Sequence, residues 1–176
     1  MRISEKLFDN VYVLELLEKN DNRGTMNVSF SGDELRKYNI DFEIKEQRIY
    51  KMSKAGTFFG IHYQELTRPQ AKLVSVILGK GLDYIVDLRK DSATYKKWEM
   101  VELNEEEPKV IYIPAGYGHA FLSMKDNTVQ MFAVNEYFID GCARQINYKD
   151  SEIGLKLPVS DVILSDYDKN APFLFE

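Results

Sequence analysis

Cysteine and histidine are scarce in this 176-residue chain, which has one cysteine, Cys142, and two histidines. A single cysteine cannot form a disulfide within the chain, and this favours a reducing compartment. No run approaches the roughly 18 consecutive apolar residues of a membrane helix, and the N-terminus leads into mixed charges without an apolar signal core. The sequence therefore predicts a cytoplasmic protein without a membrane partner.

An excess of basic residues is also missing, because 23 Lys and Arg stand against 28 Asp and Glu. Nucleic acid needs a concentrated basic surface, so it is not an expected partner. A local basic pocket for one small phosphorylated ligand remains compatible with this balance. The chain has 44% apolar residues and neither an internal repeat nor a Pro/Gly/Ser linker. We therefore expect residues 1–176 to form one domain.

Short apolar or alternating runs separated by turn residues follow one another from residue 11 onward. This pattern is typical of an all-β sandwich or barrel. One short helix is predicted where Ser31-Gly32-Asp33-Glu34 forms a capping box before Leu35. The candidate strands span residues 11–16, 25–30, 42–52, 57–63, 73–78, 82–88, 98–103, 110–113, 120–124, 128–138 and 144–148.

The two histidines both lie in glycine-bearing segments of this β-rich pattern. His62 lies in Gly60-Ile61-His62-Tyr63-Gln64, and His119 follows Pro114-Ala115-Gly116-Tyr117-Gly118. Imidazole is the side chain that titrates near neutrality, so it is the first candidate for moving a proton. We expect the function to depend on these two rings.

A metal site is one alternative, because cupins hold a metal at the mouth of a double-stranded β-helix. The Pro114-x-Gly116-x-x-His119 spacing resembles the second cupin motif. The first motif usually supplies two histidines one residue apart, whereas the residue two positions after His62 is Gln64. A stable zinc or iron site needs three or four good ligands. The sequence therefore favours a site without a metal, and a metal-dependent cupin is the minor alternative.

Without a metal, a pocket imidazole acts as a general base if one group orients it and another stabilises the charge that it creates. Lys72 is the candidate for the second task. It lies at the start of the apolar strand 73–78, so a hairpin would bring its ammonium to the same mouth as His62. The alternative for such a lysine is a strand-edge residue that keeps the protein soluble.

Several segments resemble the dTDP-4-dehydrorhamnose 3,5-epimerase family in the family's own order, from about residue 21 to 172. They are Gly60-Ile61-His62-Tyr63-Gln64, Lys72-Leu73-Val74, residues 83–92, residues 113–121, Glu136-Tyr137, Gly154 and the pattern over residues 164–172. The resemblance implies a cupin-like double-stranded β-helix (jelly roll) with one or two short helices, forming a homodimer without a cofactor. It also implies an isomerase that epimerises a nucleotide-linked, in this family dTDP-linked, 4-keto-6-deoxy sugar at carbon 3, carbon 5 or both.

The resemblance further implies roles for individual residues. His62 would remove the proton next to the ketone, and Lys72 would stabilise the enolate oxygen. Asp168 matches the aspartate that holds the histidine in its working tautomer. His119 matches a pocket histidine near the substrate, and Arg23 matches an arginine that contacts the nucleotide.

Two aromatic residues depart from the family pattern inside the predicted pocket. Phe59 stands where the family has an arginine, and Phe132 stands where it has the tyrosine that acts as the opposing acid. A phenylalanine cannot donate a proton. We predict that Tyr137 supplies the acid, with Tyr63 or water as alternatives.

A third departure lies upstream, where the family's Gln-Asp-Asn run becomes Glu46-Gln47-Arg48. Arg48 would restore the charge lost at Phe59 if its strand lay beside that of His62. Together with Gln64, these residues are predicted to contact the substrate. Two hypotheses remain: an active epimerase of a nucleotide-linked ketosugar, or a relative that keeps the fold and the base and binds the sugar without turning it over.

Overall fold

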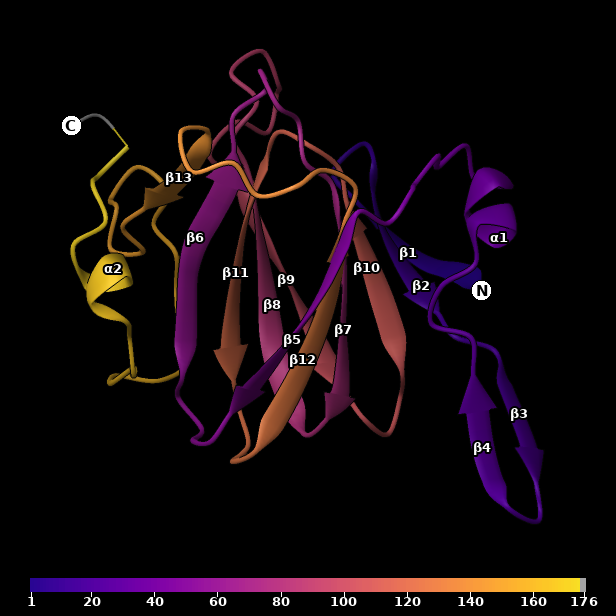
Figure 1. Ribbon diagram of the computed structural model, residues 1–176. Coiled ribbons are helices and arrows are strands. Elements are labelled where there is room, and N and C mark those ends of the chain that lie inside the picture. Colours follow the sequence, from indigo (N-terminus) through magenta and orange to yellow (C-terminus); the bar gives the residue numbers. More distant parts are fainter. Residues whose placement is uncertain (175–176) are drawn as a thin grey trace.

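Two antiparallel β-sheets face each other in the computed structural model, which describes residues 1–174 (Figure 1). The strands are β1 (Arg2–Leu7), β2 (Val11–Glu15), β3 (Glu18–Asp21), β4 (Gly24–Asn27), β5 (Glu46–Met52), β6 (Phe58–Gln64), β7 (Lys72–Leu78), β8 (Lys80–Asp87), β9 (Trp98–Asn104), β10 (Lys109–Ile113), β11 (Tyr117–Ser123), β12 (Thr128–Val134) and β13 (Ala143–Ile146). One sheet has six strands in the order β1-β2-β10-β7-β12-β5, and the other has five in the order β13-β6-β11-β8-β9. This arrangement confirms the predicted all-β jelly roll.

Apolar side chains from both sheets form the core between them. Val74 and Ile111 come from the six-stranded sheet, and Ile85 and Phe121 come from the five-stranded sheet. All four are less than 1% exposed, as expected for the inward faces of alternating strands. Phe121 also lines a cavity between the sheets, so the cavity begins where this core ends.

The two short helices of the described chain both begin at a serine cap. Helix α1 (Gly32–Arg36) begins at Ser31, whose side chain accepts a hydrogen bond from the backbone of Glu34, as the capping box predicts. Helix α2 (Asp166–Lys169) begins at Ser165 and lies beside β6 (Figure 1). Among residues 1–174, no helix is long and apolar enough to cross a membrane.

Some strand predictions were wrong where the side chains carry no apolar alternation. Strands β1 and β3 were missed because they are mostly charged and exposed. Strand β12 was predicted to continue to residue 138, but it ends at Val134, and the chain then leaves the sheet. Strand β5 begins at Glu46 rather than at residue 42.

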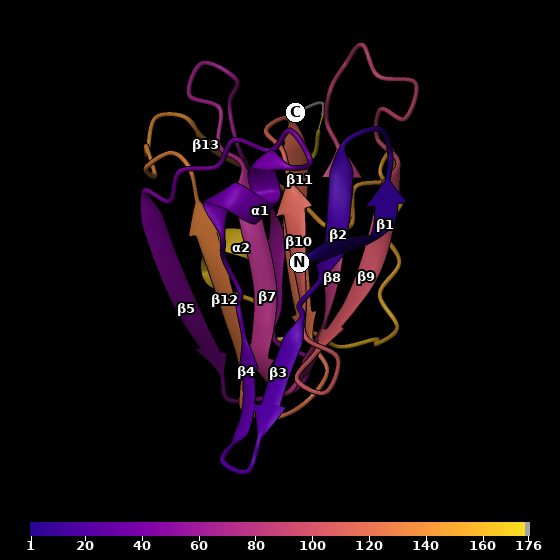
Figure 2. The same cartoon turned by 90° about the vertical axis from the view of Figure 1, so that its right-hand side faces the viewer.

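A hairpin of β3 and β4 extends away from the two sheets (Figures 1 and 2). It carries Arg23 at its turn and the exposed apolar side chain of Met26. The adjacent strand β2 has no free edge, because it pairs with β1 on one side and β10 on the other.

Candidate active site

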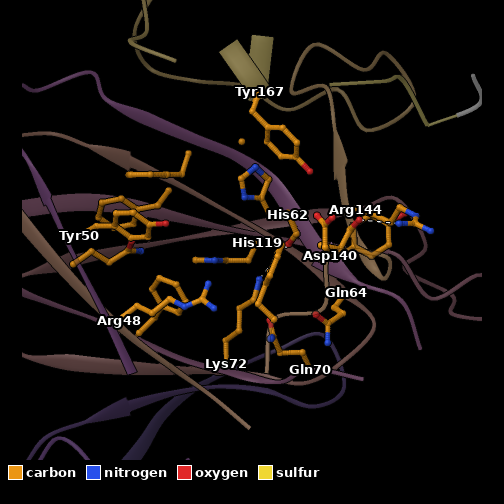
Figure 3. Close-up of a pocket in the computed structure, with 18 residues that line it drawn as sticks. Arg48, Tyr50, His62, Gln64, Gln70, Lys72, His119, Asp140, Arg144 and Tyr167 are labelled. Carbon is orange, nitrogen blue, oxygen red and sulfur yellow. Dashed lines mark hydrogen bonds between the residues drawn. The ribbon is translucent and has the colours of Figure 1, made fainter. Parts of the chain in front are cut away.

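A cavity of about 340 Å³ lies between the two sheets and is lined by side chains from both (Figure 3). This volume lies within the range of small-ligand sites. Most of the predicted site residues meet here, far apart as they are in the sequence. Those that line the cavity are Arg48, Phe59, His62, Gln64, Lys72, His119 and Phe132.

His62, on β6, pairs with Asp168 of helix α2. Nε2 of His62 lies 2.6 Å from Oδ1 of Asp168, across 106 residues of sequence. The Ser165 hydroxyl donates to the other carboxylate oxygen of Asp168, at 2.8 Å. Gly60 makes the approach possible, because a Cβ at that position would lie 2.7 Å from Oδ1 of Asp168. The sequence therefore places a histidine and a carboxylate together by means of a helix cap and a missing side chain.

The electrostatics of this pair favour an ionised carboxylate. Burial alone would raise the pKa of Asp168, but the hydrogen bond and charge of His62, with Ser165, outweigh it and hold that pKa below its usual range. An ionised carboxylate only accepts hydrogen bonds, so the neutral ring of His62 carries its proton on Nε2. Nδ1 is then left with the lone pair that a general base needs.

His119 forms a second histidine–carboxylate pair, with Asp83 of β8. Nε2 of His119 lies 2.8 Å from Oδ2 of Asp83, which is completely buried. Burial raises the pKa of Asp83, and the nearby charges of His119 and Lys72 only partly oppose this. His119 stands directly opposite His62 in the register of β11 and β6, so the two rings occupy the same wall of the cavity.

Lys72 reaches the cavity from β7, in the six-stranded sheet. Its Nζ donates a hydrogen bond to the backbone carbonyl of His62 at 3.3 Å. Burial is the main cause that lowers the pKa of Lys72 to about 8, with Arg48 adding to this and Asp83 opposing it. The structure thus brings a buried amine that is still largely protonated at pH 7 next to the His62 backbone.

Two predicted site residues have surroundings that the sequence did not indicate: Tyr137 lies outside the cavity, and Gln64 lines it with its polar atoms already bonded. Tyr137 is 55% exposed and does not line the cavity, because the chain has left β12; its neighbour Phe138, itself 52% exposed, lines the cavity instead. Gln64 lines the cavity, but its amide already donates to the carbonyls of Arg68 and Tyr137 and accepts from the Ile139 backbone. Gln64 therefore holds a loop in place, and its polar atoms are already engaged.

Arg23 also lies away from the cavity of its own chain. Its guanidinium pairs with Asp21 at 2.6 Å at the turn of the protruding hairpin, and its side chain is 85% exposed. The family resemblance places this arginine on the nucleotide, and the single chain does not bring it there. The reason is that the hairpin extends away from both sheets (Figure 1).

Arg48 lines the cavity, although the condition set for it was wrong. Its strand does not lie beside β6, because β5 pairs with β12 in the opposite sheet. The Arg48 guanidinium lies over the rings of Phe132 and Phe138, at 5.9 and 5.7 Å from their centroids. Arg48 therefore places a positive charge in the cavity that Phe59 lines, but it does so from the opposite sheet.

Several functional positions were not found from the sequence. Asp83 gave a usable signal, since a charged residue interrupts an otherwise apolar strand. Gln130 gave none; it lines the cavity, is 2% exposed, and its Nε2 has no hydrogen-bond partner among residues 1–174. A buried amide donor without a partner is costly unless a ligand or water completes it. No group of three or more His, Cys, Asp or Glu within the described residues is placed to hold a metal ion.

Comparisons with known proteins agree with this geometry. A family model described as dTDP-4-dehydrorhamnose 3,5-epimerase matches residues 5–176. A dTDP-4-dehydro-6-deoxyglucose 3-epimerase from a Streptomyces species is 35% identical over 156 residues, which are 88% of this chain and 79% of that protein. The dTDP-4-dehydrorhamnose 3,5-epimerase of Methanothermobacter thermautotrophicus is 31% identical over 172 residues, 96% of this chain and 92% of the relative.

Solved structures point the same way. The crystal structure of the dTDP-4-dehydrorhamnose 3,5-epimerase of Bacillus anthracis, with TDP and PPi bound, matches with a TM-score of 0.95 at 31% identity. The match covers 98% of this chain and 99% of that one. Similarity in sequence and in fold therefore extends over nearly the whole chain.

Proposed function

Because the chain belongs to the dTDP-4-dehydrorhamnose 3,5-epimerase family, we propose that it epimerises a dTDP-linked 4-keto-6-deoxy sugar at carbon 3, carbon 5 or both. The observation that carries this proposal is the His62–Asp168 pair in one cavity with Lys72. A base, the group that orients it and a buried cation are the parts that proton abstraction beside a ketone requires. The substrate is thus a nucleotide sugar.

In the proposed reaction, Nδ1 of His62 takes the proton from a carbon next to the ketone. The C–H bond breaks, an N–H bond forms on the ring, and the electron pair moves onto the ketone oxygen as an enolate. Asp168 stabilises the imidazolium through Nε2, the same division of labour as in other His–Asp pairs. Lys72, as an ammonium, stabilises the enolate oxygen. A proton returned to the opposite face of the carbon completes the inversion.

The positive charges of the cavity fit the diphosphate of a nucleoside diphosphate sugar. Arg48 and Arg144 both line it, on opposite sides in Figure 3. Guanidinium groups bind phosphate oxygens in a planar, bidentate geometry. Gln130 offers an unpaired amide donor that a sugar hydroxyl or carbonyl would satisfy.

We also propose that the protein acts as a homodimer in which Arg23 contacts the nucleotide in the cavity of a second copy. The support is the protruding hairpin, which carries Arg23 away from its own cavity and leaves Met26 exposed. In a monomer such a hairpin leaves apolar surface exposed to water, whereas in a symmetric dimer the same surface is covered by contacts with the second copy. Light scattering gives the mass, and a higher KM with unchanged kcat in Arg23→Ala would support the contact.

The cytoplasmic location stays a prediction of the sequence.

The proposed activity is tested by incubating the protein with dTDP-4-keto-6-deoxyglucose in deuterated water. NMR of the sugar should show deuterium at carbon 3, carbon 5 or both, because His62 exchanges the proton that it has removed with solvent. The GDP- and UDP-linked ketosugars serve as controls for the nucleotide. Absence of exchange with all three would contradict the proposal and favour the relative that binds the sugar without turning it over.

A further inference from the structure

The cavity lacks the hydroxyl that Phe132 would have carried as a tyrosine, and a neighbouring strand supplies another. We infer that Tyr50 is the acid that returns a proton to the sugar on the face opposite His62, an inference that rests on the proposed function. Three tyrosines of the described chain line the cavity: Tyr50, Tyr63 and Tyr167. Their positions distinguish them.

The pairing of β5 and β12 puts Tyr50 next to the vacant position. Tyr50 stands opposite Gln130, and Arg48 stands opposite Phe132, so Tyr50 and Phe132 are diagonal neighbours on one face of the sheet. Their rings stack with centroids 5.8 Å apart and planes 18° from parallel. Tyr50 also contacts Phe59, at 4.5 Å between centroids. The hydroxyl that Phe132 lacks is thus present on the ring of Tyr50, which stacks against Phe132.

Tyr50 and the base approach the cavity from different sheets. Tyr50 belongs to β5 in the six-stranded sheet, and His62 belongs to β6 in the five-stranded sheet. In Figure 3 the hydroxyl of Tyr50 points from the side of Arg48 towards the middle of the cavity, across from His62. A sugar ring held between the sheets presents one face to each of them. Inversion requires this arrangement, because the proton must leave one face and return to the other.

The other two tyrosines lie on the side of the base. Tyr167 comes from α2, the helix of Asp168, and its ring meets His62 edge to face at 6.0 Å. Tyr63 follows His62 on β6, and burial raises its pKa, which makes it a weaker acid. Neither comes from the sheet that faces His62.

The hydroxyl of Tyr50 is also free to react. It forms no hydrogen bond with another residue in the described part of the chain, and its side chain is 40% exposed. In the step we assign to it, the O–H bond of Tyr50 breaks and a C–H bond forms at the enolate carbon. The electron pair left on the phenolate takes a proton from water, and His62 gives its proton to water. The balance is one proton removed and one added, with no change of oxidation state.

The test separates exchange from inversion in Tyr50→Phe, which keeps the stacked ring. With dTDP-4-keto-6-deoxyglucose in deuterated water, His62 still removes the proton and returns deuterium to the same face. We expect deuterium uptake to stay within about threefold of the unaltered protein, while epimer formation falls by about 10²-fold or more, the share of a general acid. In the double variant Tyr50→Phe/Phe132→Tyr, epimer formation should recover, because the hydroxyl returns on the neighbouring ring.

Matched hydroxyl deletions complete the design. Tyr63→Phe and Tyr167→Phe remove the other two cavity hydroxyls, and Tyr112→Phe removes one from β10 of the six-stranded sheet, away from the cavity. The inference is overturned if Tyr50→Phe still forms the epimer at the original rate, or if Tyr63→Phe or Tyr167→Phe alone abolishes inversion. Circular dichroism shows whether each variant is folded. Failure of the proposed function is a different result, since the unaltered protein would then show no deuterium uptake.

Discussion

The two histidine–carboxylate pairs of the cavity have the same chemistry and different surroundings. His62 is 36% exposed and its carboxylate belongs to a helix 106 residues away, whereas His119 is 11% exposed and bonds to the adjacent strand. The pKa of Asp168 is lowered by its partner, whereas burial raises the pKa of Asp83. An accessible ring beside an ionised carboxylate suits proton transfer, and a buried pair suits positioning.

The two pairs should differ most when the histidines themselves are replaced. We predict that His62→Ala lowers the rate of deuterium uptake by about 10⁴-fold, because the other imidazole of the cavity is less exposed and pairs with a carboxyl group whose pKa is raised by burial. His119→Ala should lower it by about tenfold or less, since His119 is the less exposed of the two rings and is not the proposed base. NMR of the sugar in deuterated water measures both rates. Equal losses in the two variants would contradict the assignment of different roles to the two pairs.

The carboxylates should follow the same order with smaller effects. In Asp168→Asn the amide can donate to Nε2 and favours the wrong tautomer, so we expect exchange to fall by about 10³-fold. Asp83→Asn should cost about tenfold at most, because the buried position of Asp83 already disfavours its charge. Steady-state kinetics with both variants checks the order. A larger loss in Asp83→Asn would reverse the assignment of the two pairs.

Lys72 predicts a pH dependence with a defined sign. The folded pKa of about 8 lies below the usual value, so the ammonium is present below pH 8 and is lost as the pH rises through it. The exchange rate should fall by up to about tenfold per pH unit above 8, because the neutral amine no longer stabilises the enolate. Lys72→Met should lose about 10²-fold at pH 7 and show no such decline. A decline that persists in the variant would belong to another group.

A further effect, smaller than that of Asp168→Asn, is expected at Gly60. An added Cβ would lie 2.7 Å from Oδ1 of Asp168, so Gly60→Ala must displace the carboxylate from His62. We expect exchange to fall by about tenfold and stability by about 1–3 kcal/mol, as for other overpacked sites. Gly141→Ala is the matched control, because nothing lies within 4 Å of its added Cβ. Thermal unfolding and exchange rates measured together separate strain from loss of the base.

The sequence predicted the fold well where side chains alternate between apolar and polar. Strands β6, β7, β8 and β10 were found within two residues of their ends, because each carries a buried face. Strands β1 and β3 were missed because their exposed, charged side chains leave no pattern. The predicted end of β12 failed for a related reason, since Tyr137 and Phe138 are hydrophobic but lie in a loop.

At the site, residue type and spacing pointed to His62 and Lys72, and the resemblance added Asp168, but neither could supply partners that depend on strand register. The pairing of His119 with Asp83 follows from β11 lying next to β8, and no local pattern encodes that order. Tyr50 was missed for the same reason, since its relation to Phe132 exists only once β5 pairs with β12. The structure adds the pairing of strands that lie far apart in the sequence, which residue types alone do not reveal.

The central claim is that Asp168 holds the proton of His62 on Nε2 and leaves Nδ1 free as the base. Since the chain has only two histidines, ¹⁵N NMR of histidine-labelled protein gives two sets of ring signals, and His62→Ala assigns them. At a pH where the rings are neutral, the account predicts a protonated Nε2 and an unprotonated Nδ1 for His62, with this preference lost in Asp168→Asn. A proton found on Nδ1 of His62 would contradict it.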